Sequence, residues 1–134
     1  NGSHIRTIGK DGTGDGELVY PNSIAIDSKG NVVVYDQTGR IQVFDINSGS
    51  FLRSICHKGT DPGQLSGLGN IIFDENGDIV VADSGNDCIQ VFRYSNGQYI
   101  RSIGSKGKGP GQFYFPMGII SMITRERAIS HTNI

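Results

Sequence analysis

The sequence repeats itself once, almost residue for residue, and this repeat limits the folds that are open to it. Asp27 corresponds to Asp74 at a spacing of 47 residues, and Ile55 corresponds to Ile103 at a spacing of 48. The matching segments are 22–36 with 70–83, 40–44 with 88–92, and 51–55 with 99–103. A fixed period of this size is typical of a repeat architecture. Such repeats supply a scaffold and a surface, so any chemistry would have to be added to them, and we find none added.

Each repeat contains four apolar runs of strand length. Val, Ile, Phe and Tyr dominate these runs, and such residues are enriched in β-strands. Val32–Tyr35 is continuously apolar, so we expect both of its faces to be buried. Arg53 and Ser54 interrupt the run 51–55, which favours a strand nearer the solvent. The runs are 24–26, 32–35, 41–44 and 51–55 in the first repeat and 71–73, 79–82, 89–92 and 99–103 in the second.

Turn sequences separate the runs. Segments 27–30 and 74–77 begin with Asp and end with Gly, which is the preference of a type I turn. Ser48-Gly49 and Asn96-Gly97 are typical of tight hairpins, in which glycine supplies a positive φ. Each repeat is therefore predicted to be a four-stranded antiparallel meander. Meanders of this length arranged radially form a β-propeller with four strands per blade.

A glycine-rich connector precedes or follows each repeat, at 9–18, 58–65 and 104–113. The third copy contains Gly-x-Gly-Pro-Gly-Gln-Phe. Together with Pro-x-x-Ile-x-x-Asp, Gly-Asn/Asp-Ile/Val-Val-Val-x-Asp and Ile-Gln-Val-Phe, this pattern resembles NHL repeats over residues 1–120. The stretch 101–113 is most similar to the animal TRIM-NHL group. The predicted fold class is thus an all-β, partial propeller of NHL type.

The resemblance implies a function as well as a fold. NHL repeats form a six-bladed propeller in many members of the family, which binds a protein in some members and RNA in others. Ubiquitin-ligase activity in that group resides in a RING finger, whose Cys/His zinc cluster this sequence lacks. Some NHL-like propellers are lyases that hold zinc through histidines. His4, His57 and His131 lie in three unrelated contexts here, so a metal-dependent lyase or hydrolase is only a further alternative.

The repeats divide the chain into four parts. Residues 1–8 match 96–103 and are predicted to be the outer strand of an incomplete blade. Residues 9–55 form blade 1, 56–103 blade 2, and 104–134 an incomplete, divergent third blade. A closed ring needs about four to eight blades. The chain is then a fragment of a longer propeller, one of several copies that complete a ring, or an open array. We favour a homo-oligomer of two copies that closes the ring.

Composition excludes some functions. Glycine supplies 20 of 134 residues and lies between apolar runs, which indicates many turns rather than disorder. The net charge of −1 gives no overall attraction to nucleic acid or to an anionic membrane, and no stretch is long enough to span a bilayer. Cys56 and Cys88 lack paired spacing, so we expect reduced thiols. We further expect a cytoplasmic protein without a cofactor.

Strand parity places the connectors, and the loops between second and third strands, on one face of the molecule, where binding residues usually lie. Lys106 and Lys108 have no acidic neighbour on the third connector, and aromatic residues follow, a composition that suits phosphate and stacked bases. The alternative, which we favour, is that these lysines are solvated and that Phe113 and Phe115 pack at a blade junction. The candidate partner or RNA surface consists of Arg40, Lys58, Lys106, Lys108 and Tyr114.

Four aspartates recur as two pairs, Asp27 with Asp74 and Asp36 with Asp83. A catalytic interpretation would pair them as carboxylates. Recurrence at one position per blade instead favours structural turn residues, since a short Asp side chain accepts hydrogen bonds from nearby backbone amides. We therefore predict a non-catalytic interaction scaffold that binds a protein partner through its loop face. RNA recognition by the same face is the next hypothesis.

Overall fold

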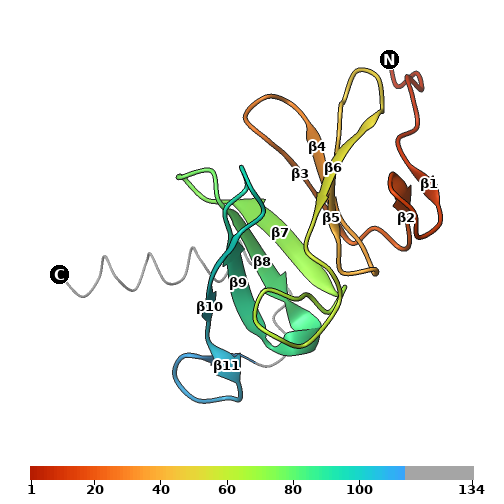
Figure 1. The fold of residues 1–134 in the computed structure, drawn as a ribbon. Helices are drawn as coiled ribbons and strands as arrows, with labels where there is room; N and C mark the ends of the chain where they lie inside the picture. The colour runs from red at the N-terminus through yellow and green to blue at the C-terminus, as the bar shows by residue number, and fades with distance from the viewer. Residues whose placement is uncertain (114–134) are drawn as a thin grey trace.

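The computed structural model describes residues 1–113, which form a series of β-sheets (Figure 1). Two four-stranded antiparallel sheets follow each other along the chain, each with its strands in sequence order. Blade 1 contains β3 (Ser23–Ile26), β4 (Val32–Tyr35), β5 (Ile41–Phe44) and β6 (Phe51–Ile55), and blade 2 contains β7 (Gly69–Phe73), β8 (Ile79–Asp83), β9 (Cys88–Phe92) and β10 (Tyr99–Ile103). The predicted all-β propeller class of antiparallel four-stranded blades is confirmed.

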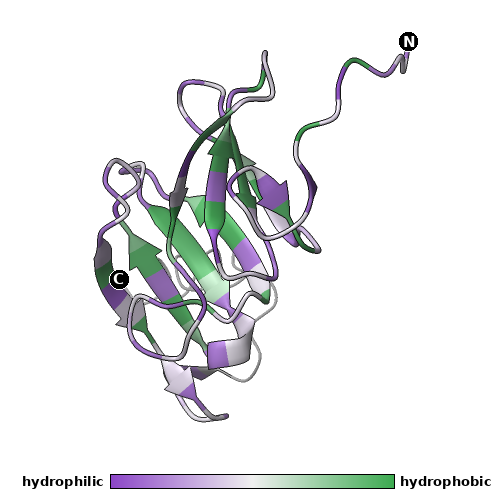
Figure 2. Cartoon of the chain, turned by 45° about the vertical axis from the view of Figure 1, so that its right-hand side comes forward, coloured by the Kyte–Doolittle hydropathy of each residue, from purple (hydrophilic) through white to green (hydrophobic). Residues whose placement is uncertain are grey.

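The two central strands of each blade are the most buried. Every residue of β4, β5 and β8 is buried, as are all residues of β9 after its first. Figure 2 shows the hydrophobic residues concentrated in these strands. The outer strands β6 and β10 are mostly half-buried or exposed, in line with the interruption of the apolar pattern at Arg53 and Ser54. Alternation of burial in β3 leaves Ile24 and Ile26 on the exposed side.

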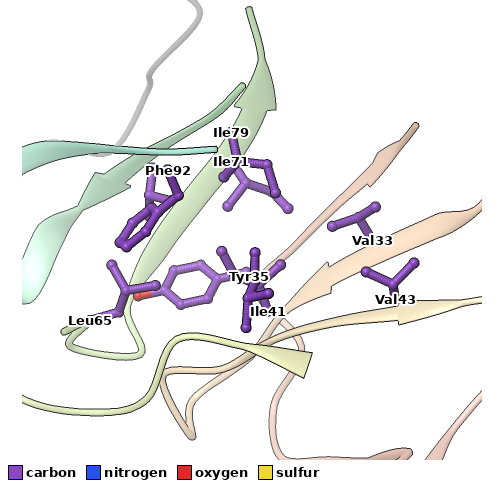
Figure 3. Packing of buried hydrophobic residues seen from close by; sticks show 10 residues of the cluster. Val33, Tyr35, Ile41, Val43, Leu65, Ile71, Ile79 and Phe92 are labelled. Carbon is purple, nitrogen blue, oxygen red and sulfur yellow. The ribbon is translucent and has the colours of Figure 1, made fainter. Parts of the chain in front are cut away.

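The two blades pack face to face around one shared core. Their first strands, β3 and β7, lie side by side. Tyr35 reaches from blade 1 toward Leu65 of the connector, as Figure 3 shows. Each large apolar side chain buried in this way contributes about 1.5–3 kcal/mol to folding. The shared buried core comprises Val33, Tyr35, Ile41, Val43 and Ile55 from blade 1, Leu65 from the connector, and Ile71, Ile79, Val81 and Phe92 from blade 2.

All three connectors form the same small loop. β1 (Lys10–Asp11) pairs in parallel with β2 (Glu17–Leu18), and β11 (Ser105–Lys106) pairs in parallel with β12 (Gln112–Phe113). Between them, Lys58 forms an isolated parallel bridge with Leu65. The connectors are therefore ordered, repeated elements rather than loose linkers.

The structure accounts for the difference between the spacings of 47 and 48 residues. The loop after β4 covers 36–40, whereas the loop after β8 contains the 3-10 turn Ser84–Asn86 followed by Asp87 in the left-handed conformation. One additional residue fits in this second loop. The insertion changes the spacing of all later residues without shifting the register of the sheet.

Residues 1–9 carry no strand, although their contacts follow the repeat. The Arg6 guanidinium donates a hydrogen bond to the carbonyl of Asn47, and Ile8 packs against the core cluster on the outward side of blade 1. A strand requires a hydrogen-bonded neighbour, and no strand within residues 1–113 pairs with this segment. The part of the predicted third blade at 114–134, with Tyr114, lies outside the described residues.

Candidate interaction surfaces

Blade 1 holds the first connector through one aspartate and one glutamine. The Asp36 carboxylate accepts hydrogen bonds from the backbone N–H of Val19 at 2.8 Å and from that of Thr38 at 3.0 Å. Gln42 is fully buried, and its side-chain oxygen accepts the N–H of Gly16 at 2.8 Å while its amide donates to the carbonyl of Glu17 at 2.6 Å. Two buried side chains, Asp36 directly after β4 and Gln42 of β5, thus clamp the loop that enters the blade.

Blade 2 repeats this clamp on the second connector. The Asp83 carboxylate accepts the N–H of Ser66 at 3.0 Å, and Gln90 accepts the N–H of Gly63 at 2.9 Å and donates to the carbonyl of Gln64 at 2.7 Å. Gln90 also donates to Asp83 at 2.9 Å. Asn86 adds a bond to Asp83 at 2.7 Å and another to the carbonyl of Gly59 at 3.0 Å. The buried carboxylate is surrounded by donors, as a buried charge requires.

These clamps define a connector face, which consists of connectors 9–20, 56–68 and 104–113 and of loops 36–40 and 83–88. The first connector donates a hydrogen bond to Asp36 of loop 36–40, and Asn86 of loop 83–88 donates one to the second connector. The loops of the connector face are therefore held in place by hydrogen bonds to buried side chains of the blades.

Arg40 is committed mainly to its own blade. Its guanidinium donates to the carbonyls of Gly14 at 3.2 Å and Glu17 at 3.4 Å, and its Nε donates to the Thr38 hydroxyl at 3.1 Å. An ion pair with Asp15 at 3.8 Å lies at the surface. Only 17% of the Arg40 side chain is exposed. Arg40 therefore supports the first connector, and its role in a partner surface stays a prediction.

The three candidate lysines lie on the connector face. Lys58 is exposed, and its ammonium group donates to the carbonyl of Gln37 at 3.5 Å. Lys106 and Lys108 are exposed on the third connector, in which Gln112 accepts the N–H of Gly109 at 3.1 Å. In the first two connectors the equivalent side chains, Glu17 and Gln64, accept hydrogen bonds from the N–H groups of Gly14 and Asp61. The repeated connector therefore presents lysines from two different blade junctions.

Asp27 and Asp74 organise the turns at the opposite end of the blades. Asp27 accepts the N–H groups of Lys29 and Asn31, and Asp74 accepts those of Asn76 and Asp78. These bonds close the loop between the first and second strands of each blade. Neither carboxylate faces the connectors, so the four recurrent aspartates do not meet in one site.

A groove at this opposite end was not predicted from the sequence. It has a volume of about 490 Å³ and lies between the blades, where Arg53 of β6 meets Tyr94 of blade 2. The guanidinium of Arg53 lies 4.4 Å from the centre of the Tyr94 ring and donates to the Tyr94 carbonyl at 2.6 Å. The Tyr94 hydroxyl donates to Asp27 at 2.7 Å. The recurrence of arginine at 6, 53 and 101 was the available signal, since each occupies the same position of the repeat.

Electrostatics in the groove follow from this chain of contacts. Burial and the hydrogen bond to Asp27 raise the pKa of Tyr94. Burial alone would raise the pKa of Asp27, but hydrogen bonds from Tyr94, Asn31 and Lys29 lower it below its usual value. A neutral phenol is thus paired with an ionised carboxylate. This arrangement joins the two blades, and no acid–base pair suited to proton transfer at neutral pH results from it.

The two cysteines are partly buried, and a raised pKa lowers the fraction of the reactive thiolate form. Cys56 and Cys88 are free thiols, and burial together with the charge of Asp83 raises their pKa values to about 12 and about 11. Among residues 1–113, no three His, Cys, Asp or Glu side chains come together in a way that could hold a metal ion. No helix in the same range is long and apolar enough to cross a membrane.

Comparison with known proteins supports the architecture described above. A family model described as a 6-bladed beta-propeller matches residues 1–61 and again residues 58–127. The chain belongs to this family. The two matches together span residues 1–127, so the family model covers both repeats.

Each similar protein matches only part of this chain, and each match covers only part of that protein. Protein lin-41 of Caenorhabditis elegans is 50% identical over 42 residues, which are 31% of this chain and 4% of that protein. Hydrazine synthase of Kuenenia stuttgartiensis is similar in structure, with a TM-score of 0.53 and 21% identity over 75% of this chain and 26% of the other. A Bacteroides caccae protein of unknown function has a TM-score of 0.48 and 24% identity over 59% of this chain and 26% of the other. The propeller chain thus spans only a small part of the length of these relatives.

Proposed function

We propose that this propeller chain is a non-catalytic, NHL-type interaction scaffold that binds a protein partner through its connector face. The observation that carries the proposal is the repeated clamp, in which Asp36 with Gln42 and Asp83 with Gln90 hold successive connectors against the blades. The buried polar groups of each blade are used to order exposed loops. Loops fixed on a rigid scaffold are the usual position of binding residues.

Two further features favour binding over catalysis. The recurrent aspartates are occupied by backbone and side-chain donors, with Asp36 and Asp83 fully buried. The connector face carries both charges, for example Lys58 beside Asp61 and Arg40 beside Asp15, which suits a mixed protein surface. A cytoplasmic location, with Cys56 and Cys88 kept reduced, remains part of this proposal.

The experiment compares partner capture by variants of the two ends of the blades. Lys58→Glu and Lys108→Glu reverse charges on the connector face, while Lys29→Glu reverses an exposed charge at the opposite end. Proteins retained by the immobilised chain are identified by mass spectrometry, and the affinity of each recovered partner is measured by titration. We expect the connector-face variants to weaken binding at least tenfold and Lys29→Glu to have little effect. Equal loss in all three, or loss only in Lys29→Glu, would contradict the proposal.

RNA recognition is the second candidate, and a specific feature favours it. The third connector carries Lys106 and Lys108 and contains no acidic residue between 104 and 113, unlike the first two connectors. Two exposed lysines on an ordered loop can contact adjacent phosphates. This part of the connector face is therefore the most suitable place for a nucleic acid.

Salt dependence separates RNA binding from protein binding. Gel-shift titration with single-stranded RNA is carried out at several salt concentrations for the wild type, for a Lys106→Ala/Lys108→Ala variant, and for a Lys29→Ala/Arg93→Ala control. Each phosphate contact that is lost reduces the slope of log K against log salt by about 0.7 for a single strand. RNA recognition predicts a shallower dependence of log K on log salt only in the Lys106→Ala/Lys108→Ala variant. An identical slope in both variants rules out a role for the third connector.

A further inference from the structure

The outward side of blade 1 has the apolar pattern of a surface that another blade covers. Ile24 is 64% exposed, whereas Ile71, which occupies the corresponding position in blade 2, is 3% exposed because blade 1 packs on it. Ile26 and Ile46 are also exposed, and their counterparts Phe73 and Tyr94 pack at the junction between the blades. We call Ile24, Ile26, Ile46 and Tyr20 the open face of blade 1.

Residues 1–8 cover only the outer part of this open face. Arg6 bonds to the hairpin of blade 1 as Arg53 bonds to that of blade 2, and Ile8 lies beside Gly49 as Ile55 lies beside Gly97. A pocket of about 300 Å³ remains next to Ile8, lined by Ile8, Leu18, Pro21, Asn22, Ser23, Ile24 and Val34. The contacts of an outer strand are present, and those of the three strands that would accompany it are missing within residues 1–113.

The junction between the two blades shows how such a face is filled. Tyr35, at the end of β4, is fully buried, and its hydroxyl accepts the N–H of Gly67 at 2.9 Å. Gly67 must be glycine in this arrangement, because a Cβ there would lie 2.2 Å from the carbonyl oxygen of Gln37 and its φ is +88°. A large residue on one side of the junction is thus matched by the smallest residue on the other.

At the positions equivalent to Tyr35 and Gly67 in other repeats, the large and the small residue change places. Tyr20 occupies the position of Gly67 on the open face and is 77% exposed. At the end of β8, Ala82 replaces Tyr35, and Phe115 follows in the next repeat at the position of Gly67. By repeat position in the sequence, each pair therefore contains one aromatic residue, either Tyr35 with Gly67 or Phe115 with Ala82, although Phe115 itself lies outside the described residues. Close packing of a junction leaves room for one ring at this point.

We propose that the open face of blade 1 binds a four-stranded blade whose second strand ends in a small residue of the alanine class, with Tyr20 supplying the aromatic ring of that junction. A blade that carried tyrosine at this position would place two rings in the space for one. The partner of this surface is consequently selected by size.

The test extends the full chain at its N-terminus with a second copy of residues 56–95. Because residues 1–8 correspond to 96–103, the added segment supplies the first three strands of a blade whose outer strand is already present. The added copy ends its second strand with alanine. A matched extension carries Ala82→Tyr in the added copy only, and a third extended protein, the rescue variant, combines this change with Tyr20→Gly.

The readout is the exposure of Ile24 and Ile26 methyl groups to a soluble paramagnetic probe, with Ile71 as the buried reference in the same molecule. The alanine extension should lower their exposure to the level of Ile71 and produce a nuclear Overhauser contact between the added alanine methyl and the Tyr20 ring. The tyrosine extension should leave both methyl groups exposed, and Tyr20→Gly should restore protection. The proposal is overturned if the tyrosine extension protects as well as the alanine extension, or if neither the alanine extension nor the rescue variant protects the open face.

Discussion

The backbone N–H of Ser66 donates a hydrogen bond of 3.0 Å to the carboxylate of Asp83, 17 residues further along the chain. The equivalent bond in the first repeat runs from Val19 to Asp36 and measures 2.8 Å. Each bond ties the end of a connector to the end of the second strand of the blade that follows. Both carboxylates are fully buried, so this contact is part of the core as well as of the surface loops.

Replacing Asp83 tests how much this clamp stabilises the blade. Both oxygens of Asp83 accept hydrogen bonds, among them those from the N–H and hydroxyl of Ser66 and from the side-chain amides of Asn86 and Gln90. In Asp83→Asn, the new NH₂ group would face these donors and leave buried N–H groups without an acceptor. This should lower the free energy of unfolding by about 1–3 kcal/mol. We expect this loss in urea unfolding at pH 7, with Asp11→Asn, an exposed position, within about 0.5 kcal/mol of the wild type. A change for Asp83→Asn as small as that of the control would show that the clamp is unimportant.

The strands were predictable because their signals are local. Alternation and continuous apolar runs mark β3 to β10, and Asp and Gly mark the turns between them, so that each boundary depends on neighbouring residues. Val32–Tyr35 and Ile79–Ala82 lie in separate sheets, as the repeat required. The strand expected at residues 1–8 differs for the same physical reason, since a strand is also defined by a neighbour, and the sequence of the segment alone does not provide one.

The site was less predictable because its contacts cross between distant parts of the chain. Gln42 appears in the sequence as one polar residue in an apolar run, and its connector partners are 25 and 26 residues away. Arg53 and Tyr94 are 41 residues apart and belong to different repeats. Only the recurrence of glutamine and arginine at fixed repeat positions could have identified these residues. Pairing them requires knowledge of which blade packs against which.

Substitution of Gly67 tests the tight contact between the blades. A Cβ at Gly67 would lie 2.2 Å from the carbonyl oxygen of Gln37, whereas a Cβ at Gly77, which also has a positive φ, meets nothing within 4 Å. Gly77→Ala should cost about 1–2 kcal/mol from backbone strain alone. Gly67→Ala should cost a further 1–3 kcal/mol, roughly, because the blades must separate. Urea unfolding of the two variants measures the difference, and equal losses would mean that the junction yields without cost.

Tyr94→Phe tests the hydrogen bond from the Tyr94 hydroxyl to Asp27, which links the two blades beside the groove between them. The pKa of Asp27 is lowered in the folded protein, so its contribution to stability is present above the ordinary value of 3.8 and is lost as the pH falls below it. Removing the Tyr94 hydroxyl deletes one of the donors that cause this shift. We expect a loss of about 1 kcal/mol at pH 7 and a weaker dependence of stability on pH between 5 and 2, roughly. The control is Tyr99→Phe, since the Tyr99 hydroxyl contacts Ser102 and no carboxylate; a pH dependence that is unchanged in Tyr94→Phe would contradict the assignment.

The two free thiols should react slowly and in a fixed order. Burial and the charge of Asp83 raise the pKa of Cys56 to about 12 and that of Cys88 to about 11, while an unperturbed thiol has a value of about 8.5. Because the thiolate is the reactive form, native protein at pH 8 should be alkylated by iodoacetamide first at Cys88 and then at Cys56. Both should react at similar rates in urea, where their surroundings are lost. Peptide mass spectrometry over time gives the order, and reaction of native Cys56 at the rate seen in urea would show that Asp83 and burial do not suppress its ionisation.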